Sequence, residues 1–260
     1  NFYYAPPSGF LALCTKNLPD PTVAPSEHFN TILYDDGAGA KTGVGFQPDL
    51  VWVKSRGSAY EHELTDSVRG VTQAVSSDST GIETTDSTGL TAFGSDGFTV
   101  GADTNYSDTT GDGMVAWNWK AGTSQGSTAT SGSGTAKTYT ASYNANAGFS
   151  IISYTGNATH GHTIPHHLSV KPAIMLVKGT SAIASWTVYA DITGLGAEKY
   201  MELHNASAVQ DSGAAIWNDT EPTSSVFTLG DSTDTNGNDT TYIAYCWHSV
   251  EGYSKIGSYE

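Results

Sequence analysis

An internal duplication constrains the fold of this chain more than any other feature. Four short segments recur in the same order, and the offset between partners drifts only from 120 residues (29 to 149) to 129 residues (97 to 226). Repetition at a nearly constant offset indicates two copies of one folding unit. The recurring segments begin at Phe29, Phe46, Gly97 and Met114 in the first half and at Phe149, Val170, Val226 and Tyr242 in the second.

The recurring segments have the pattern of β-strands. Residues 50–53 and 173–177 are short apolar runs that follow a proline and end at a lysine, which is typical of a buried strand. Residues 115–119 and 243–247 alternate between larger and smaller side chains, so successive residues point to opposite faces of a sheet. Helical patterns are weak. We therefore expect an all-β fold of tandem antiparallel β-sandwich domains of the jelly-roll or concanavalin-like kind.

Composition supports this interpretation and sets the domain limits. The chain has 260 residues, enough for about two domains, and its 29 glycines suit many tight turns. We expect a first repeat at 29–120, a Gly/Ser/Thr-rich connector at 121–148 and a second repeat at 149–260. Residues 251–259 resemble the first strand of the repeat, so they either begin a third copy or close the sheet of the second. Residues 1–28 have no counterpart and are predicted to be the terminal strand and linker of a preceding domain.

Charge and cysteine content exclude several classes of partner. The formal net charge is −15, with 11 Lys and Arg against 26 Asp and Glu, whereas a protein that binds nucleic acid or anionic membranes needs a basic surface. No apolar run approaches the ~18 residues of a membrane span. Cys14 and Cys246 are far apart and are expected to be buried thiols, because a small disulfide scaffold would carry more cysteines.

Two groups of residues could bind metal ions. His160, His162, His166 and His167 fall within eight residues, and imidazoles at such spacing can ligate zinc, copper or nickel. The alternative is a turn that leads into a strand, and the equivalent segment of the first repeat has no histidine. The Asp- and Asn-rich segments at 103–113 and 231–239 could hold calcium, but they lack the EF-hand order and are better interpreted as solvated hairpin loops. No cofactor is expected otherwise.

Enzyme signatures are weak, so we expect a protein without catalytic activity. Glycosidases need a pair of carboxylates, and Glu61 and Glu63 would share one face of a strand, but the second repeat lacks them. There is no Gly-x-Ser-x-Gly nucleophile motif, and residues 37–42 only superficially resemble a phosphate-binding loop.

Aromatic residues indicate a binding mode instead, since exposed rings stack on the faces of sugars. Trp186 and Trp217 lie in less regular stretches, and together with Tyr189 they are the candidates for a ligand-binding surface. The regular alternation around Trp117, Trp119 and Trp247 favours packing in the core.

Several segments of the chain resemble those of known protein families. The head of the chain, with residues 6–13 reading PPSGFLAL, resembles the end of SPRY-type, concanavalin-like β-sandwich domains. The blocks at 45–54, 164–172, 217–227 and 242–247 resemble a domain of unknown function that follows such modules in tail-fibre-like proteins of bacteriophages, many of them marine. The resemblance implies a virion-surface or extracellular location, tail-protein partners, a homo-oligomer (a trimer being favoured) and no catalytic residue.

The expected function is therefore that of a structural virion-surface protein, a tail fibre or another adhesin-like component that contacts a glycan or protein of the host. The alternatives are a secreted bacterial carbohydrate-binding module and a virion decoration protein.

Overall fold

The computed structural model describes residues 23–35, 37–108 and 110–258. Cys14 and most of the predicted terminal strand and linker at 1–28 lie outside the described residues. The described part is built of antiparallel strands with three short 3-10 turns (Pro25–Glu27, Gly196–Glu198 and Gly213–Ala215), so the predicted all-β class is confirmed. Among these residues no helix is long and apolar enough to cross a membrane.

The first copy is a sandwich of a larger and a smaller sheet. Its core lies between them and includes Val51, Val53, Phe98 and Met114, each almost fully buried. The larger sheet has the order β1 (Phe29–Tyr34), β9 (Met114–Trp119), β3 (Leu50–Ser55), β4 (Glu63–Asp66), β5 (Gln73–Ser76) and β6 (Thr84–Thr85). The smaller sheet has the order β2 (Gly39–Thr42), β8 (Gly97–Val100) and β7 (Leu90–Gly94).

The second copy repeats this arrangement with additional strands. A core that includes Tyr154, Val177 and Phe227 fills the space between its two sheets. The larger sheet has the order β10 (Thr123–Ala129), β12 (Thr138–Asn144), β13 (Phe149–Thr155), β20 (Thr241–Trp247), β15 (Ile174–Gly179), β16 (Thr187–Ala190), β17 (Lys199–Glu202) and β18 (Gln210–Asp211). The smaller sheet has the order β11 (Ser131–Gly132), β14 (His162–Pro165) and β19 (Val226–Leu229).

Equivalent strands of the two copies pair in the same register. Trp52 lies opposite Trp117 in the first copy, and Leu176 lies opposite Tyr245 in the second. Tyrosines near the ends of β1 and β13 also behave alike: the hydroxyl of the partly buried Tyr34 donates to the Tyr106 carbonyl oxygen at 2.8 Å, and that of the buried Tyr154 donates to the Thr235 carbonyl oxygen at 2.6 Å. The recurring sequence segments therefore specify the same ladder twice.

Residues 121–148 do not form the predicted connector. They contain β10, β11 and β12, and β12 pairs with β13 from Phe149 to Tyr154. The Ser/Thr-rich composition resembles a linker, but Tyr139 and Ala141 are buried on the core side of the sheet while their neighbours face outward. The predicted strand at 251–259 does not appear among its described residues, which form a turn closed by one isolated bridge between Val250 and Ser254.

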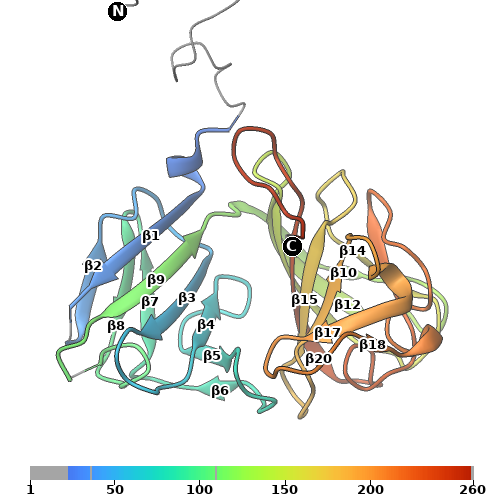
Figure 1. Ribbon diagram of the computed structural model, residues 1–260, viewed down its shortest axis with the longest axis horizontal. Helices are drawn as coiled ribbons and strands as arrows, with labels where there is room; N and C mark the ends of the chain where they lie inside the picture. Colours follow the sequence, from blue (N-terminus) through green and yellow to red (C-terminus); the bar gives the residue numbers. More distant parts are fainter. Residues whose placement is uncertain (1–22, 36, 109, 259–260) are drawn as a thin grey trace, which may run out of the picture.

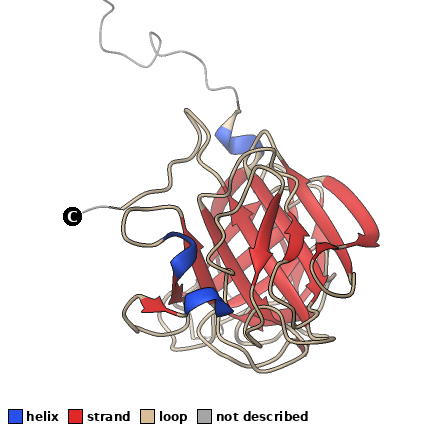
Figure 2. Ribbon diagram, turned by 90° about the vertical axis from the view of Figure 1, so that its right-hand side faces the viewer, coloured by secondary structure: helices blue, strands red, loops and turns tan. Residues whose placement is uncertain are grey.

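The two sandwiches pack against each other through their larger sheets. Figure 1 shows the copies side by side, the first from blue to green and the second from yellow to red, and Figure 2 shows that nearly all regular structure is strand. A third apolar cluster joins the outer faces of both larger sheets and contains Leu64 and Val75 from the first copy with Trp186 and Tyr245 from the second. The molecule is therefore a stack of sheets with three apolar layers between them.

Buried polar contacts fix this junction. Arg69 binds Asp66 at 2.6 Å and Glu83 at 2.9 Å, and the hydroxyl of Tyr245, in the second copy, donates to Asp66 at 2.8 Å. The ammonium of Lys178 is buried in the second copy and donates to the Thr80 carbonyl oxygen of the first at 3.1 Å. Burial lowers the pKa of Lys178 to about 8. Separating the copies would break these buried polar contacts, and leaving a buried charge without its partner costs free energy. The two copies therefore form one body.

Candidate functional site

Three tryptophans form an apolar surface on the first copy, which we call the tryptophan surface: Trp52, Trp117 and Trp119. Trp52 on β3 and Trp117 on β9 are direct cross-strand partners, with ring centroids 6.1 Å apart at an angle of 68°. All three are partly exposed and together line a hollow of about 300 Å³. The site therefore consists almost entirely of indole rings.

Strand alternation places these rings outside the sandwich. Val51, Val53 and Ala116 point into the core of the first copy, so the residues between them point to the opposite face of the sheet. The second copy covers that face over β4 and β5, where Leu64 and Val75 are buried. Over β9 and β3 the cover is incomplete, which leaves the tryptophan surface open at the edge of the junction.

Trp119 anchors the surface to the rest of the molecule. Its ring lies 5.0 Å from that of Phe29, 6.2 Å from that of Phe149 and 5.9 Å from that of Trp247, measured between centroids. Phe149 and Trp247 belong to the second copy. Because contacts from both copies hold Trp119, the neighbouring rings of Trp52 and Trp117 sit on a rigid base.

The second copy has no equivalent surface. Leu176 and Tyr245 occupy the positions of Trp52 and Trp117, and both are buried in the junction. The ring of Tyr245 stacks on that of Trp186 with centroids 6.3 Å apart. The two copies thus share the strand framework, and the tryptophan surface belongs to the first alone.

The sequence pattern did not predict the tryptophan surface, because it favoured packing of Trp117 and Trp119 in the core. The alternating pattern correctly groups Val115, Trp117 and Trp119 on one face of β9. It does not say which face meets the smaller sheet. The one available signal was the difference between copies, since Trp52 and Trp117 stand where the second copy has Leu176 and Tyr245.

The predicted ligand-binding residues are not on the surface. Trp186 is fully buried, and its indole nitrogen Nε1 donates to the Ser76 carbonyl oxygen across the junction at 2.8 Å. Trp217 and Tyr189 are buried in the core of the second copy, where their rings meet edge to face. The expectation of exposed rings at these three positions is wrong, because Tyr189 lies in the buried strand β16, which Trp186 directly precedes, and Trp217 packs into the core after the turn Gly213–Ala215.

The four histidines do not converge on one point. His162 is buried, with one ring nitrogen 2.9 Å from Asn236 Oδ1 and the other 2.8 Å from Thr130 Oγ1. His166 is also buried, and burial lowers its pKa to about 4. His160 is partly exposed near Asp231, while the ring of His167 stacks on that of Tyr143 with centroids 4.6 Å apart.

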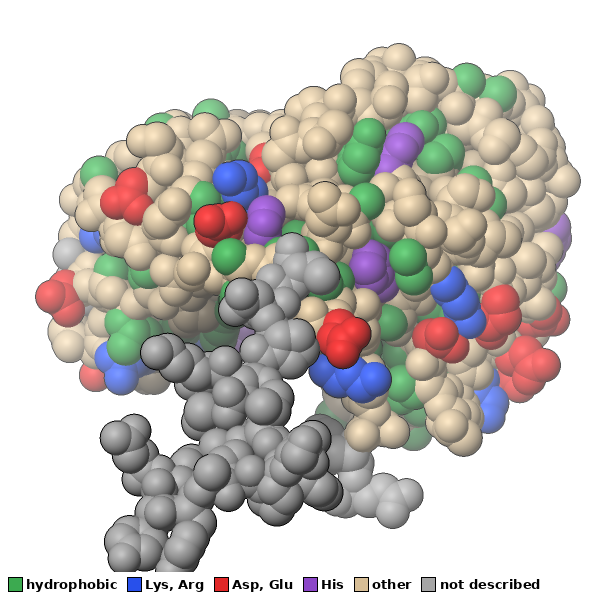
Figure 3. Space-filling view, turned by 90° about the horizontal axis from the view of Figure 1, so that it is seen from above, with side chains coloured by type: hydrophobic (Ala, Val, Ile, Leu, Met, Phe, Trp, Pro, Cys, Tyr) green, Lys and Arg blue, Asp and Glu red, His purple; other side chains and the backbone are tan. Residues whose placement is uncertain are grey.

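On the face drawn in Figure 3, the visible histidine side chains also lie apart from one another. Within 23–35, 37–108 and 110–258, no group of three or more His, Cys, Asp or Glu side chains is arranged to hold a metal ion. The four histidines are therefore not brought together as metal ligands among the described residues, whereas calcium binding by the Asp- and Asn-rich loops stays a prediction. Those side chains bind both within and outside their loops: Asp103 Oδ1 accepts from the Asn105 amide, whereas Asn236 Oδ1 accepts from the Asn157 amide.

Glu61 and Glu63, the candidate glycosidase pair, differ in environment. Glu63 is 4% exposed, and its Oε1 accepts from Ser76 Oγ at 2.9 Å and Asn105 Nδ2 at 3.1 Å. Its second oxygen, Oε2, is buried without a hydrogen-bond partner. Burial, reinforced by the nearby carboxylates of Glu61 and Asp103, raises the pKa of Glu63 to about 7. The equivalent residue in the second copy is Thr187.

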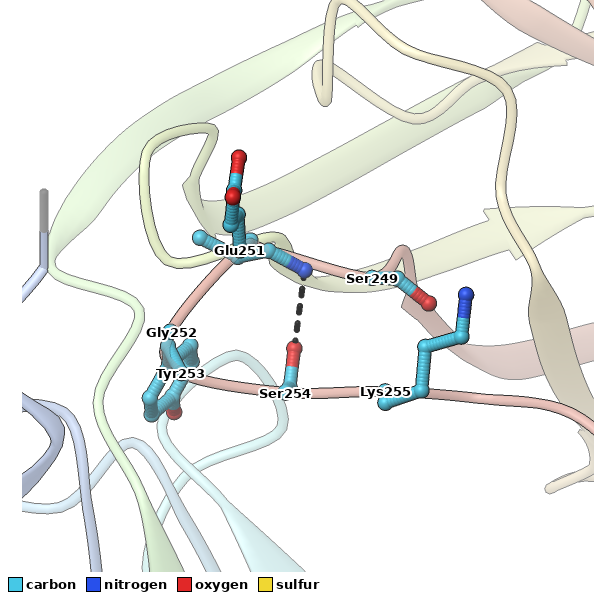
Figure 4. A pocket seen from close by; sticks show the side chains of 7 residues that line it. Ser249, Glu251, Gly252, Tyr253, Ser254 and Lys255 are labelled. Carbon is cyan, nitrogen blue, oxygen red and sulfur yellow. Dashed lines mark hydrogen bonds between the residues drawn. The ribbon is translucent and has the colours of Figure 1, made fainter. Parts of the chain in front are cut away.

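Two other hollows are better explained by local structure. One of about 420 Å³ lies between the copies and is lined by polar residues, among them Asp49, whose carboxylate accepts from Ser67 Oγ and the Ala121 amide. Asp49 thereby fixes the chain where it passes between copies. The other, of about 560 Å³, is enclosed by seven consecutive residues, 249–255, and is the inside of a single turn (Figure 4).

Comparison with known proteins gives a family and no activity. A family model described as a domain of unknown function, DUF7483, matches residues 24–260. No curated protein matches, and no solved structure matches.

Proposed function

Because this chain belongs to the DUF7483 family, a domain of unknown function, we propose from its surface chemistry that it is a non-catalytic binding protein that holds a carbohydrate chain on the tryptophan surface. The observation that carries the proposal is the hollow lined by Trp52, Trp117 and Trp119 alone. Indole faces pack against the C–H groups of a sugar ring, and a rigid base limits the entropy lost on binding.

Charge narrows the class of ligand. The chain carries a net charge of −15, which disfavours polyanions such as nucleic acids. Lys54 stands near the tryptophan surface on β3, but its ammonium donates to the carbonyl oxygen of Ser58 at 2.8 Å. A neutral glycan suits this combination of apolar rings and acidic surroundings better than an anionic one.

The biological setting of the proposal rests on the family resemblance of the sequence. In that setting the protein is a bacteriophage virion-surface component, a tail fibre or another adhesin-like part, and the tryptophan surface contacts a host glycan. A secreted bacterial carbohydrate-binding module or a virion decoration protein would use the same surface. Tail genes next to the coding sequence would favour the virion-surface role.

Glycan binding by the full chain tests the proposal. A panel of neutral and acidic glycans is screened first, and the affinity of each ligand found is then measured by calorimetry for Trp117→Ala. We expect about a tenfold loss of affinity, since one stacking contact contributes about 1–1.5 kcal/mol.

The control is Tyr200→Ala, which removes a partly buried aromatic ring on β17 of the second copy. It should leave the affinity unchanged. If no glycan binds, or if Trp117→Ala binds as tightly as the original chain, the carbohydrate role is wrong. Turnover of a polysaccharide that disappears in Glu61→Gln would show an enzyme instead.

A further inference from the structure

The outer strand of the first copy's larger sheet, β1, is paired on one side only. Among the described residues it forms a ladder with β9 and with no other strand. The Lys120 amide donates to the His28 carbonyl oxygen beside this ladder. Since residues of an antiparallel strand alternate in the direction of their backbone groups, His28 and the even-numbered residues bond to β9. The N–H and C=O groups of Phe29, Thr31 and Leu33 therefore point outward.

The same edge is covered in the second copy. There the His248 amide donates to the Gly148 carbonyl oxygen, so β13 and β20 form the equivalent ladder. The outward groups of β13 face β12, which lies antiparallel with Phe149 opposite Asn144 and Ile151 opposite Ser142. The fold thus accommodates an antiparallel strand at this edge, and the first copy lacks one in the described structure.

The other edges of the larger sheets are protected in ways that β1 is not. β10 is polar and its pairing is interrupted between Gln125 and Thr128, while β6 and β18 are only two residues long. Such bulges and short strands prevent edge-to-edge association. By contrast, β1 is six residues long and regular, contains no charge or proline, and exposes 63% of Leu33.

We propose that β1 is the contact between two copies of this chain, with the two β1 strands antiparallel about a two-fold axis at Thr31. In this register Thr31 faces its own equivalent, and Phe29 faces Leu33 of the other chain. The outward N–H and C=O groups of all three residues then find partners, and the exposed part of Leu33 is buried. An uncharged strand is also the place where two chains of net charge −15 can meet with the least repulsion.

The arrangement closes at two copies, because each β1 has one free edge. It also aligns the tryptophan surfaces, since an antiparallel pair keeps the same face of both sheets on one side. Three strand spacings separate the two Trp117 positions, about 14 Å at ~4.8 Å per strand. Only this last consequence, a longer continuous binding face, rests on the proposed function.

Measurement of the mass in solution over a range of concentrations tests the proposal. The full chain should have twice the mass of one chain at high concentration and dissociate on dilution. Leu33→Lys places a charge at the contact, and Thr31→Pro removes an outward N–H without affecting the ladder to β9. Each should weaken the dimer at least tenfold, with unchanged circular dichroism.

The matched control is Ser127→Lys, which adds the same charge to the exposed edge strand β10 and should leave the dimer intact. Hydrogen exchange gives a second measurement: the Thr31 and Leu33 amides should become slower to exchange as the concentration rises. A monomer at all concentrations, a trimer, or a dimer that survives both β1 variants would overturn the proposal. Glycan binding is measured separately, so either proposal can fail without the other.

Discussion

The two copies of the repeat use the same sheet face for different purposes. In the second copy the positions of Leu176 and Tyr245 are interior, because the first copy packs over them. In the first copy the equivalent positions, Trp52 and Trp117, lie at the open margin of the junction. The backbone ladders are alike, so the coverage by the other copy decides which aromatic rings are interior and which are exposed.

The largest loss of stability should come from removing an aromatic residue that is buried at the junction. Trp186→Ala removes a fully buried indole and leaves the Ser76 carbonyl oxygen without its donor across the junction. We expect a loss of about 3–5 kcal/mol in the free energy of unfolding from the cavity, with about 1 kcal/mol or more from the unpaired carbonyl. Denaturant titration of the variant measures this. A loss below about 1 kcal/mol would mean that the junction does not depend on Trp186.

The second effect concerns the buried charges between the copies. Arg69→Met leaves Asp66, which is fully buried, without its cationic partner. Breaking a buried pair in this way costs about 3–5 kcal/mol, because one charge stays uncompensated. The matched control is Lys171→Met, which removes the partly exposed pairs with Asp191 and Glu221 in the second copy and should cost about 1 kcal/mol or less. Equal losses of unfolding free energy for the two variants would contradict the interpretation that the junction excludes water from the Arg69–Asp66 pair.

The third effect depends on pH and distinguishes Glu63 from its counterpart Thr187. The pKa of Glu63 rises from an ordinary value of 4.5 to about 7 in the folded chain. Between these values the folded chain binds the proton and the unfolded chain does not, so stability falls as the pH rises from about 4.5 to 7. The full span corresponds to about 3 kcal/mol.

Glu63→Gln should abolish this contribution. The stability of the variant relative to the original chain should therefore be higher at pH 8 than at pH 4. Thermal unfolding at both values is the measurement. Thr187→Val in the second copy, which carries no titrating group, should leave the pH dependence unchanged. The same pH dependence in Glu63→Gln and in the original chain would show that another group is responsible.

The smallest effect on stability should come from the exposed side. Trp117→Ala removes a partly exposed ring that meets the Trp52 ring at an angle of 68°, so we expect a loss of about 1 kcal/mol or less in the free energy of unfolding. The same variant should show the loss of glycan affinity. Trp186→Ala, measured where it remains folded, should keep that affinity, which would separate the two classes of tryptophan.

Much of the framework was predictable from sequence, because it depends on local periodicity. The alternation in residues 115–119 and the apolar runs at 50–53 and 173–177 appear as β9, β3 and β15, which pair in matching registers. The connector prediction at 121–148 failed for a definable reason. Small polar residues are compatible with both a linker and an outer strand, and only the neighbouring β13 selects the strand.

The candidate sites were predicted less well, because burial depends on distant parts of the chain. His162 and His166 are adjacent in sequence to His160 and His167, yet the turn and strand direct their rings to different partners. Trp186 follows an irregular stretch that would be exposed on an isolated sandwich. It is interior here because residues around Ser76, 110 positions earlier, pack over it.

By itself the sequence determined the class of fold, the duplication and the faces on which strand residues are grouped, since these follow from turn chemistry and a period of two. The tertiary structure decided which of those faces is covered. That choice follows from the packing of one copy on the other, a contact between residues more than 100 positions apart. It buries Trp186 and Tyr245, and it leaves Trp52 and Trp117 at the surface.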